Sequence, residues 1–474
     1  MVVQHNMQAA NANRMLNVTT SAQSKSTEKL SSGYRINRAA DDAAGLTISE
    51  KMRKQIRGLD QASTNAEDGV SSVQTAEGAL TEVHSMLQRM NELATQAANG
   101  TNSKDSDRQA IQDEIDQLTT EIDRVSETTK FNETYLLKGE AGTKTINMKA
   151  HDAGLKGTLT DNGDGTATFV MDSLKDGDSV SIGGKTYTIG SKKADVDTAV
   201  AAKIKTADDK FTVNGQEITI VDNYKDSTSQ DAATVAAGKA ADQKAGKYTL
   251  ADAKALVKEG ATVKVGTDEY KVMTDKDTNG IDDTDASVIS KDVAYGLASK
   301  ELLAANQIGD TKGSAKIENT GAKADGSFKI TTGQAEVANS LSFSLHVGAD
   351  ADMTNKIQVN IDAMDSASLG IKGLNVKDDS GNAATYAVDA ISDAISKVSS
   401  QRSSLGAVQN RLEHTINNLD NVVENTTTAE SRIRDTDMVE EMVNYSKNNI
   451  LAQAGQSMLA QANQSNQGVL SLLQ

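Results

Sequence analysis

The chain has 474 residues, with no proline, cysteine or tryptophan among them, and its aromatic content is only 3%. The absence of cysteine excludes a disulfide framework, a thiolate nucleophile and a cysteine-based metal site. The formal net charge of −17 argues against nucleic acid as a partner, because binding to a phosphate backbone requires clustered positive charge.

Residues 1–40 are the first predicted element, a helix with a narrow apolar stripe made by Met7, Ala10, Leu16 and Leu30. So narrow a stripe cannot offset the entropy lost on ordering, so we expect this helix to be ordered only when it packs against another surface. The first residues lack the basic and apolar regions of a secretory signal, and no stretch is apolar over the roughly 18 residues of a membrane span. We expect neither a cleaved signal peptide nor insertion into a membrane.

Two further helices are predicted before residue 140. From Met52 to Ala97, apolar residues recur at alternating steps of four and three, the spacing of a helix that packs lengthwise on another. The stretch at 99–103 is typical of a turn, and a second seam then includes Ile115 and Ile122. The lack of proline fits long helices, since one proline inside a helix costs about 3 kcal/mol.

Between residues 141 and 344, apolar residues no longer follow helical spacing but alternate with polar residues, as in strands. Three segments share one arrangement of two short strands around a glycine-containing turn: Val180–Ile189, Phe211–Ile220 and Val263–Val272. Alanine- and lysine-rich stretches at 194–205, 232–244 and 293–305 predict short helices. We therefore predict an inserted α+β region with about three hairpin repeats.

The C-terminal part is again helical. Stepping by four and three from Ile391 to Thr426 predicts a long helix, and its expected packing residues are Ile395, Leu405, Leu412 and Leu419.

Residues 448–474 carry no charge, yet Val443, Ile450 and Met458 belong to an apolar stripe whose opposite face is rich in Gln, Asn and Ser. Such a face suits a helix surrounded by copies of itself, since a solvated helix usually carries charges on its outer face. The alternative is a frayed amphipathic tail.

Motifs that would indicate catalysis or ligand binding are incomplete. Residues 179–186 approach a phosphate-binding loop but lack its first glycine and fall in a predicted hairpin turn. Residues 275–280 resemble the start of a calcium loop, but Ala286 occupies the position of its bidentate glutamate, so a polar turn is favoured over weak calcium binding. The five histidines are scattered. We predict no enzymatic activity, no cofactor and no metal.

On several stretches the chain resembles the bacterial flagellins. These stretches are Leu30–Leu46, Leu87–Ala94, Glu121–Val125, Phe131–Leu137, Leu405–Leu412, Ala429–Ile433, Leu459–Asn463 and Val469–Leu473. They lie near both ends and follow the order found in that family, whereas the middle of the chain matches nothing specific.

The resemblance implies a secreted subunit of the extracellular flagellum that polymerises with itself and serves motility. It implies export under a chaperone that holds the C-terminal helix, and assembly with filament cap and hook-junction proteins. It also implies two host receptors. Toll-like receptor 5 would bind at Gln88, Arg89, Leu93 and Glu114, and NAIP receptors at Leu470, Leu472 and Leu473.

The expected fold is mainly α at both termini, as a long antiparallel helical bundle or coiled coil, with an inserted α+β, hairpin-rich variable region in an elongated multidomain chain. We expect five segments: filament-core helices at 1–40 and 435–474, inner-bundle parts at 41–140 and 345–434, and the variable, surface-exposed region at 141–344. The resemblance places a hairpin near Phe131–Leu137 in the first inner-bundle part, and strands precede the long helix in the second. Two alternatives stay open, a hook–filament junction protein and an adhesin or glycan-binding activity in the variable region.

Overall fold

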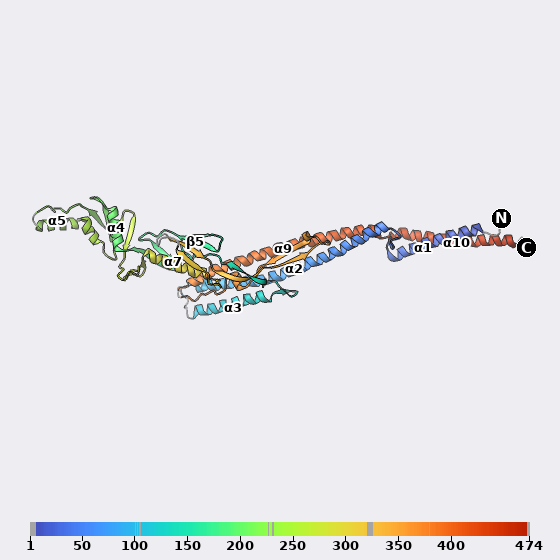
Figure 1. Cartoon of the computed structure of the whole chain (residues 1–474), viewed down its shortest axis with the longest axis horizontal. Coiled ribbons are helices and arrows are strands. Elements are labelled where there is room, and N and C mark those ends of the chain that lie inside the picture. Colours follow the sequence, from blue (N-terminus) through green and yellow to red (C-terminus); the bar gives the residue numbers. More distant parts are fainter. Residues whose placement is uncertain are drawn as a thin grey trace. The chain divides into compact units, whose positions relative to one another are not determined.

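The computed structural model describes residues 6–471, except 100, 102, 104–105, 226, 230–231, 320–325 and 379, and describes side chains as far as residue 465. Both ends of the chain are helical and the middle carries most of the strands (Figure 1). The helices are α1 (Met7–Ser32), α2 (Ala43–Ala97), α3 (Asp107–Thr128), α4 (Lys193–Lys203), α5 (Ala232–Lys244), α6 (Leu250–Leu256), α7 (Lys291–Asn306), α8 (Ser366–Leu369), α9 (Asn382–Arg434) and α10 (Met438–Ser471), with a 3₁₀ turn η1 (Met353–Asn355).

The strands form one eight-stranded sheet, one four-stranded sheet and three two-stranded ribbons within the described residues. Their bounds are β1 (Lys130–Phe131), β2 (Thr134–Tyr135), β3 (Glu140–Asn147), β4 (Gly157–Asp161), β5 (Thr166–Met171), β6 (Ser179–Ile182), β7 (Lys185–Ser191), β8 (Lys210–Val213), β9 (Gln216–Ile220), β10 (Lys247–Tyr248), β11 (Thr262–Val265), β12 (Asp268–Val272), β13 (Val288–Ile289), β14 (Lys316–Asn319), β15 (Ser327–Thr331), β16 (Gln334–Asn339), β17 (Leu341–His346) and β18 (Lys356–Ile361). The predicted combination of helical ends and an inserted α+β region is confirmed.

The chain divides into two compact units. The first contains Met1–Gln74, Phe343–Val359 and Leu405–Gln474, and the second contains Thr75–Ser342 and Asn360–Ser404. The long helices α2 and α9 each contribute to both units. The breaks after α1 and before α10 lie close to the expected segment boundaries at residues 40 and 434.

In the first unit, the ribbon β17–β18 packs on α2 and α9. Ala66, Ile357 and Leu412 are buried together there. The ribbon approaches α2 so closely at Gly69 that a Cβ atom on this residue would lie 2.2 Å from Cδ1 of Leu345. Any side chain at Gly69 would therefore force the ribbon away from the helix.

In the second unit, α2, α3 and α9 form a helical bundle with an aliphatic core. Leu80, Leu87, Ile115, Ile122 and Val398 are all buried. Arg402 of α9 lies 3.5 Å from Glu77 of α2, and Arg89 of α2 lies 2.9 Å from Glu114 of α3. Apolar burial therefore holds the bundle together, with ion pairs at its edge.

The predicted hairpin near residues 131–137 is present. β1 and β2 pair antiparallel around Asn132 and Glu133, which both have positive φ. Leu136 and Leu137 follow the hairpin and are fully buried. The turn thus returns the chain into the bundle core directly after α3.

A buried arginine closes the turn between α2 and α3. Arg108 is 2% exposed and donates to the main-chain oxygens of Ala97 (3.0 Å), Asn99 (3.4 Å) and Asp378 (2.5 Å). A cation at this position also opposes the negative end of the α2 dipole. Arg108 thereby fixes the end of α2 to the segment that precedes α9.

The three predicted hairpins are β6–β7, β8–β9 and β11–β12, and all lie in the eight-stranded sheet. Asn214 and Gly215 link β8 to β9 with φ values of 50° and 82°, as a type I′ turn requires. The predicted short helices correspond to α4, α5 and α7. The hairpin pattern and its turns are therefore confirmed.

The three hairpins are not three equal modules, however. β6–β7 packs into a core that contains Phe169 and Phe328, whereas β8–β9 and β11–β12 share a separate core around Phe211 and Val263. The four-stranded sheet, in the order β14-β15-β5-β4, supplies Phe169 and Phe328, whose rings stack 6.4 Å apart. The inserted region therefore has two separate cores. Its division depends on pairing between strands that are far apart in sequence, not on the local repeat.

The two incomplete ligand motifs are turns. Gly183 and Gly184 connect β6 to β7. In the other motif, Asp275 accepts a hydrogen bond from the main-chain nitrogen of Gly280, and Asp277 accepts one from that of Asn279. Within the described ranges, no three histidine or carboxylate side chains are grouped so that they could hold a metal ion.

Candidate assembly and recognition surfaces

The terminal helices α1 and α10 run side by side in opposite directions in the first unit (Figure 1). Asn6 donates a hydrogen bond from Nδ2 to the Ala462 oxygen at 3.1 Å, and at the other end Lys29 Nζ lies 3.6 Å from Glu441. The two chain ends thus pair with each other within a single chain.

Small and polar side chains make the seam between the two helices. The less exposed positions recur at steps of three and four, as in a coiled coil: Ala9, Ala12, Leu16, Thr19, Gln23, Ser26 and Leu30 on α1, and Glu441, Tyr445, Asn448, Ala452, Gly455, Leu459 and Ala462 on α10. At Gly455, a Cβ atom would lie 3.4 Å from Cδ1 of Leu16, so the helices approach closely there. Half of these side chains are Gly, Ala, Ser or Thr, so the seam buries less apolar area than a seam of large aliphatic residues would.

Many of the large apolar side chains of both helices face away from the seam. Val443, Ile450 and Met458 are 63%, 66% and 64% exposed. On α1, Met7, Met15 and Val18 are exposed in the same way. Scattered exposed apolar residues are ordinary, but a concentration on two adjacent helices indicates an interaction surface.

A groove of about 650 Å³ runs along the α1–α10 pair. Its wall includes Met15 and Leu16 from α1, and Leu451, Ala454 and Met458 from α10. No side chain from residue 448 to 465 carries a charge, so the wall contributed by α10 is uncharged. The groove is suited to an apolar helix face rather than to a charged ligand.

Two turns contact each other: the one that connects α1 to α2 and the one that connects α9 to α10. Tyr34 and Asp435 form an isolated antiparallel bridge, and Arg35 donates a hydrogen bond from its side chain to the Ile433 oxygen at 2.6 Å. The Arg434 guanidinium lies over the Tyr34 ring, 4.7 Å from its centroid. Asp437 then caps α10 by accepting hydrogen bonds from the backbone nitrogens of residues 439 and 440.

The residues expected to pack the long helices against each other lie in the core, with one exception. Leu405, Leu412, Ile115 and Ile122 are fully buried and Leu419 is nearly so. Ile395 is only half-buried, because α9 turns residues 391, 394 and 398 toward the core in this stretch. Ile395 therefore lies at the margin of this core rather than at its centre.

The residues expected to contact a receptor do not share one surface. Arg89 is exposed and pairs with both Glu114 (2.9 Å) and Glu92 (3.2 Å), and hydrogen bonding to Glu114 raises the pKa of the Arg89 guanidinium. Gln88 is also exposed and its amide lies 3.1 Å from the His84 ring. Leu93, in contrast, is 2% exposed and belongs to the bundle core.

The helix geometry explains this correction. Four residues advance an α-helix by slightly more than one turn, so Leu93 is rotated toward the core relative to Arg89. The neighbouring core positions Met90, Ala94 and Ala97 confirm where that core face lies. Periodicity places both residues on one side of α2, but only burial separates the exposed edge from the core.

Leu472 and Leu473 lie outside the described residues, and of Leu470 only the helical backbone is described. Sequence reasoning also missed two features here, the nearly buried Glu441 at the seam and the buried Arg108. Both are charged residues in predicted helices, and helical periodicity carries no signal that would distinguish them from surface charges.

None of the helices in the described part of the chain combines the length and apolar character needed to cross a membrane.

Comparison with known proteins identifies two matching family regions. The bacterial flagellin N-terminal helical region matches residues 3–142, and the bacterial flagellin C-terminal helical region matches residues 388–473.

Relatives match over their whole length. The flagellin of Clostridium tyrobutyricum is 38% identical over 475 residues, which cover 98% of this chain and 100% of that protein. The flagellin of Bacillus subtilis (strain 168) is 36% identical with full coverage of both chains, and flagellin D of Vibrio cholerae is 34% identical with 99% coverage of both. The chain therefore belongs to the bacterial flagellins and is a structural subunit of the extracellular flagellar filament.

Proposed function

We propose that the subunit polymerises through the outward apolar faces of α1 and α10, which pack in the filament against the same two helices of neighbouring copies. The supporting observation is the exposure of Val443, Ile450 and Met458 in a single chain. Repeated heterologous contacts of this kind do not close into a ring and therefore produce an open helical fibre.

The composition of α10 supports packing among copies of the chain. A helix surrounded by identical helices places the same side chains close together many times, so repeated charges would repel each other. Residues 448–465 contain none. Their Gln and Asn side chains can donate and accept hydrogen bonds without that repulsion.

Electron microscopy of the purified full chain tests this proposal. We expect long helical filaments from the full chain, and a soluble, mostly helical monomer from a chain that lacks residues 435–474. Filaments formed by the truncated chain would contradict the role of α10. Short rings from the full chain would instead favour a hook–filament junction protein.

We also propose that an export chaperone covers the apolar face of α10 before assembly. The exposed apolar side chains of α10 would otherwise promote premature association of subunits inside the cell. Cap and hook-junction proteins would then contact the same terminal helices at the two ends of the filament. Pull-down of the chaperone by the full chain, but not by the chain that lacks residues 435–474, is the expected result.

For host recognition, we propose that Arg89, Glu114 and Gln88 form the part of the second unit that Toll-like receptor 5 contacts. The Arg89–Glu114 pair lies on the exposed edge between α2 and α3, and Leu93 is excluded because it is buried. Reporter-cell signalling should fall when Arg89→Ala and Glu114→Ala are combined. Signalling at the wild-type level would remove this proposal, provided that circular dichroism shows the bundle intact.

Recognition of Leu470, Leu472 and Leu473 by NAIP receptors remains a proposal based on the family alone. Replacing the three leucines with alanine should abolish inflammasome activation by protein delivered to the cytosol. Unchanged activation would contradict it.

A further inference from the structure

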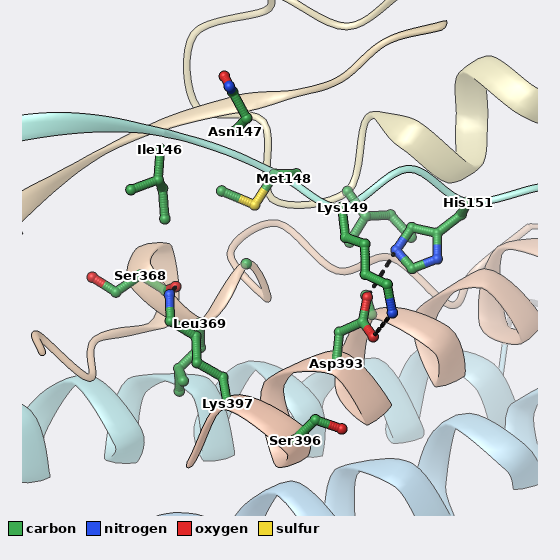
Figure 2. A pocket seen from close by; sticks show the side chains of 13 residues that line it. Ile146, Asn147, Met148, Lys149, His151, Ser368, Leu369, Asp393, Ser396 and Lys397 are labelled. Atoms are coloured by element: carbon green, nitrogen blue, oxygen red, sulfur yellow. Dashed lines mark hydrogen bonds and ion pairs between the residues drawn. The ribbon is translucent and has the colours of Figure 1, made fainter. Parts of the chain in front are cut away.

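The second unit contains a pocket of about 320 Å³ that has no part in the surfaces described above (Figure 2). The end of β3 and the segment that follows it form one wall, and α9 forms the other. The last turn of α8 closes one side. At Gly370, which follows α8, a Cβ atom would lie 3.0 Å from Sδ of Met148, so a side chain there would crowd the pocket wall.

Asp393 and Lys397 line the pocket from successive turns of α9. An acid followed by a lysine four residues later normally forms an ion pair on a helix surface. Here the two side chains diverge (Figure 2). Asp393 lies 2.8 Å from Lys149 Nζ and 3.6 Å from His151 Nε2, whereas Lys397 donates to the Ser368 oxygen at 2.5 Å.

Within the described chain, the Lys397 ammonium has no carboxylate in contact with it, although Asp362 and Asp365 attract it from farther away. No carboxylate of the described residues lies within ion-pairing distance of it, and one main-chain oxygen satisfies only one of its three N–H donors. Burial lowers the pKa of Lys397, which indicates that its surroundings do not fully compensate the charge. An anion that entered the pocket would supply the missing partner.

The charge of the lining also favours an anion. Among the lining residues, two lysines, Lys149 and Lys397, accompany one carboxylate, Asp393, so the lysines outnumber the carboxylates. Asp362 and Asp365 act on Lys397, and Asp389 acts on Lys149, from outside the lining. The whole chain carries −17. In a chain this acidic, a lining with more lysines than carboxylates is a local exception, and the Lys397 ammonium, which no described carboxylate contacts, is its anion-binding group because Lys149 is already paired with Asp393.

The remaining lining is apolar and sets the size of the ligand. Ile146, Met148, Ile308 and Leu369 supply aliphatic and thioether surface. A volume of 320 Å³ is near the lower end of the range for ligand pockets. A small molecule with one anionic end and a short aliphatic chain matches both parts.

We propose that this pocket binds a small aliphatic carboxylate, with the carboxylate on the Lys397 ammonium and the chain against Met148 and Leu369. The proposal is independent of filament assembly, since none of its residues belongs to α1 or α10. Sequence reasoning could not find the pocket because its lining comes from four separate segments of the chain.

Titration of the full-length monomer with hexanoate tests the proposal, with ¹³C-methyl methionine NMR as the readout. We expect saturable binding and a shift of the Met148 methyl signal, assigned with Met148→Leu. Hexanol has the same chain without the charge and should bind at least about tenfold more weakly. Lys397→Met should weaken hexanoate binding by about tenfold or more, whereas Lys156→Met, an exposed lysine outside the pocket, should leave it unchanged.

Three results would overturn the proposal: no saturable shift up to about 10 mM hexanoate, equal affinity for hexanol, or equal loss in the two lysine variants. The comparison of hexanoate with hexanol uses the unmodified chain. This comparison therefore tests the role of the ligand's charge even if Lys397→Met does not fold.

Discussion

Replacing Ile450 with glutamine should strongly weaken assembly without destabilising the subunit. Ile450 is 66% exposed on α10 and is turned away from the seam with α1. Surface substitutions of this kind usually change the free energy of unfolding by less than about 0.5 kcal/mol. The melting temperature of the helical bundle that contains α2 and α9 should therefore stay unchanged.

The expected cost appears when the filament forms. Complete burial of the exposed part of an isoleucine side chain contributes about 1.5–2 kcal/mol, and burying a glutamine amide without a partner costs about 1–2 kcal/mol more. A loss of about 3 kcal/mol for each added subunit raises the critical concentration about 100-fold. Seeded polymerisation followed by sedimentation measures that concentration directly.

Val170→Gln is the matched control for this experiment. Val170 is also an exposed apolar residue, 46% exposed, but it lies on β5 in the inserted region. It should leave the critical concentration unchanged. If Ile450→Gln polymerised at the wild-type critical concentration, the outward face of α10 would not be an assembly contact and the reasoning would be refuted.

Substitutions at three further positions test other parts of the structure. Arg108→Met should destabilise the second unit by about 3 kcal/mol in urea unfolding, because it leaves buried main-chain oxygens without donors; a loss below 1 kcal/mol would show that water replaces the guanidinium. Gly455→Ala should assemble normally and Gly455→Leu should not, since Leu16 leaves room for one methyl group only; sedimentation distinguishes the two. For Asp282, burial raises the pKa, but hydrogen bonds from Thr284, Thr274 and Asp285 outweigh it and leave the pKa below 3.8. Its contribution to stability is therefore complete above about pH 4 and is lost as the pH falls through the lowered pKa, so Asp282→Asn should flatten the dependence of the melting temperature on pH below 4; an unchanged slope would contradict this.

The parts of the fold that could be predicted depend on local periodicity. The seam from Met52 to Ala97 and the one from Ile391 to Thr426 both lie in the observed helices α2 and α9. The hairpins could be predicted because Gly183, Gly215 and Gly266 mark turns between alternating strands. In each case the signal lies within about ten residues of the element that it specifies.

The parts that could not be predicted depend on contacts between distant segments. β15 pairs with β5 and β16 with β3, and nothing in the local pattern of these strands identifies the partner. The division of the inserted region into two cores follows from such pairings. Leu93 and Ile395 show the same limit on helices, because a seam gives the face of a helix but not the width of its buried part.

The orientation of the terminal helices couples ordering of the chain ends to assembly. An isolated helix is only marginally stable in water, and its stability in a protein comes mostly from the apolar face that it buries. In a single chain, α1 and α10 bury a seam of small residues such as Ala12, Ala452 and Gly455, and leave Met15, Ile450 and Met458 in solvent. The seam aligns the two helices but contributes little burial, so most of the free energy available to them is gained only when neighbouring copies cover the outward faces. With the large side chains turned inward instead, the subunit would be stable alone and would have little reason to polymerise.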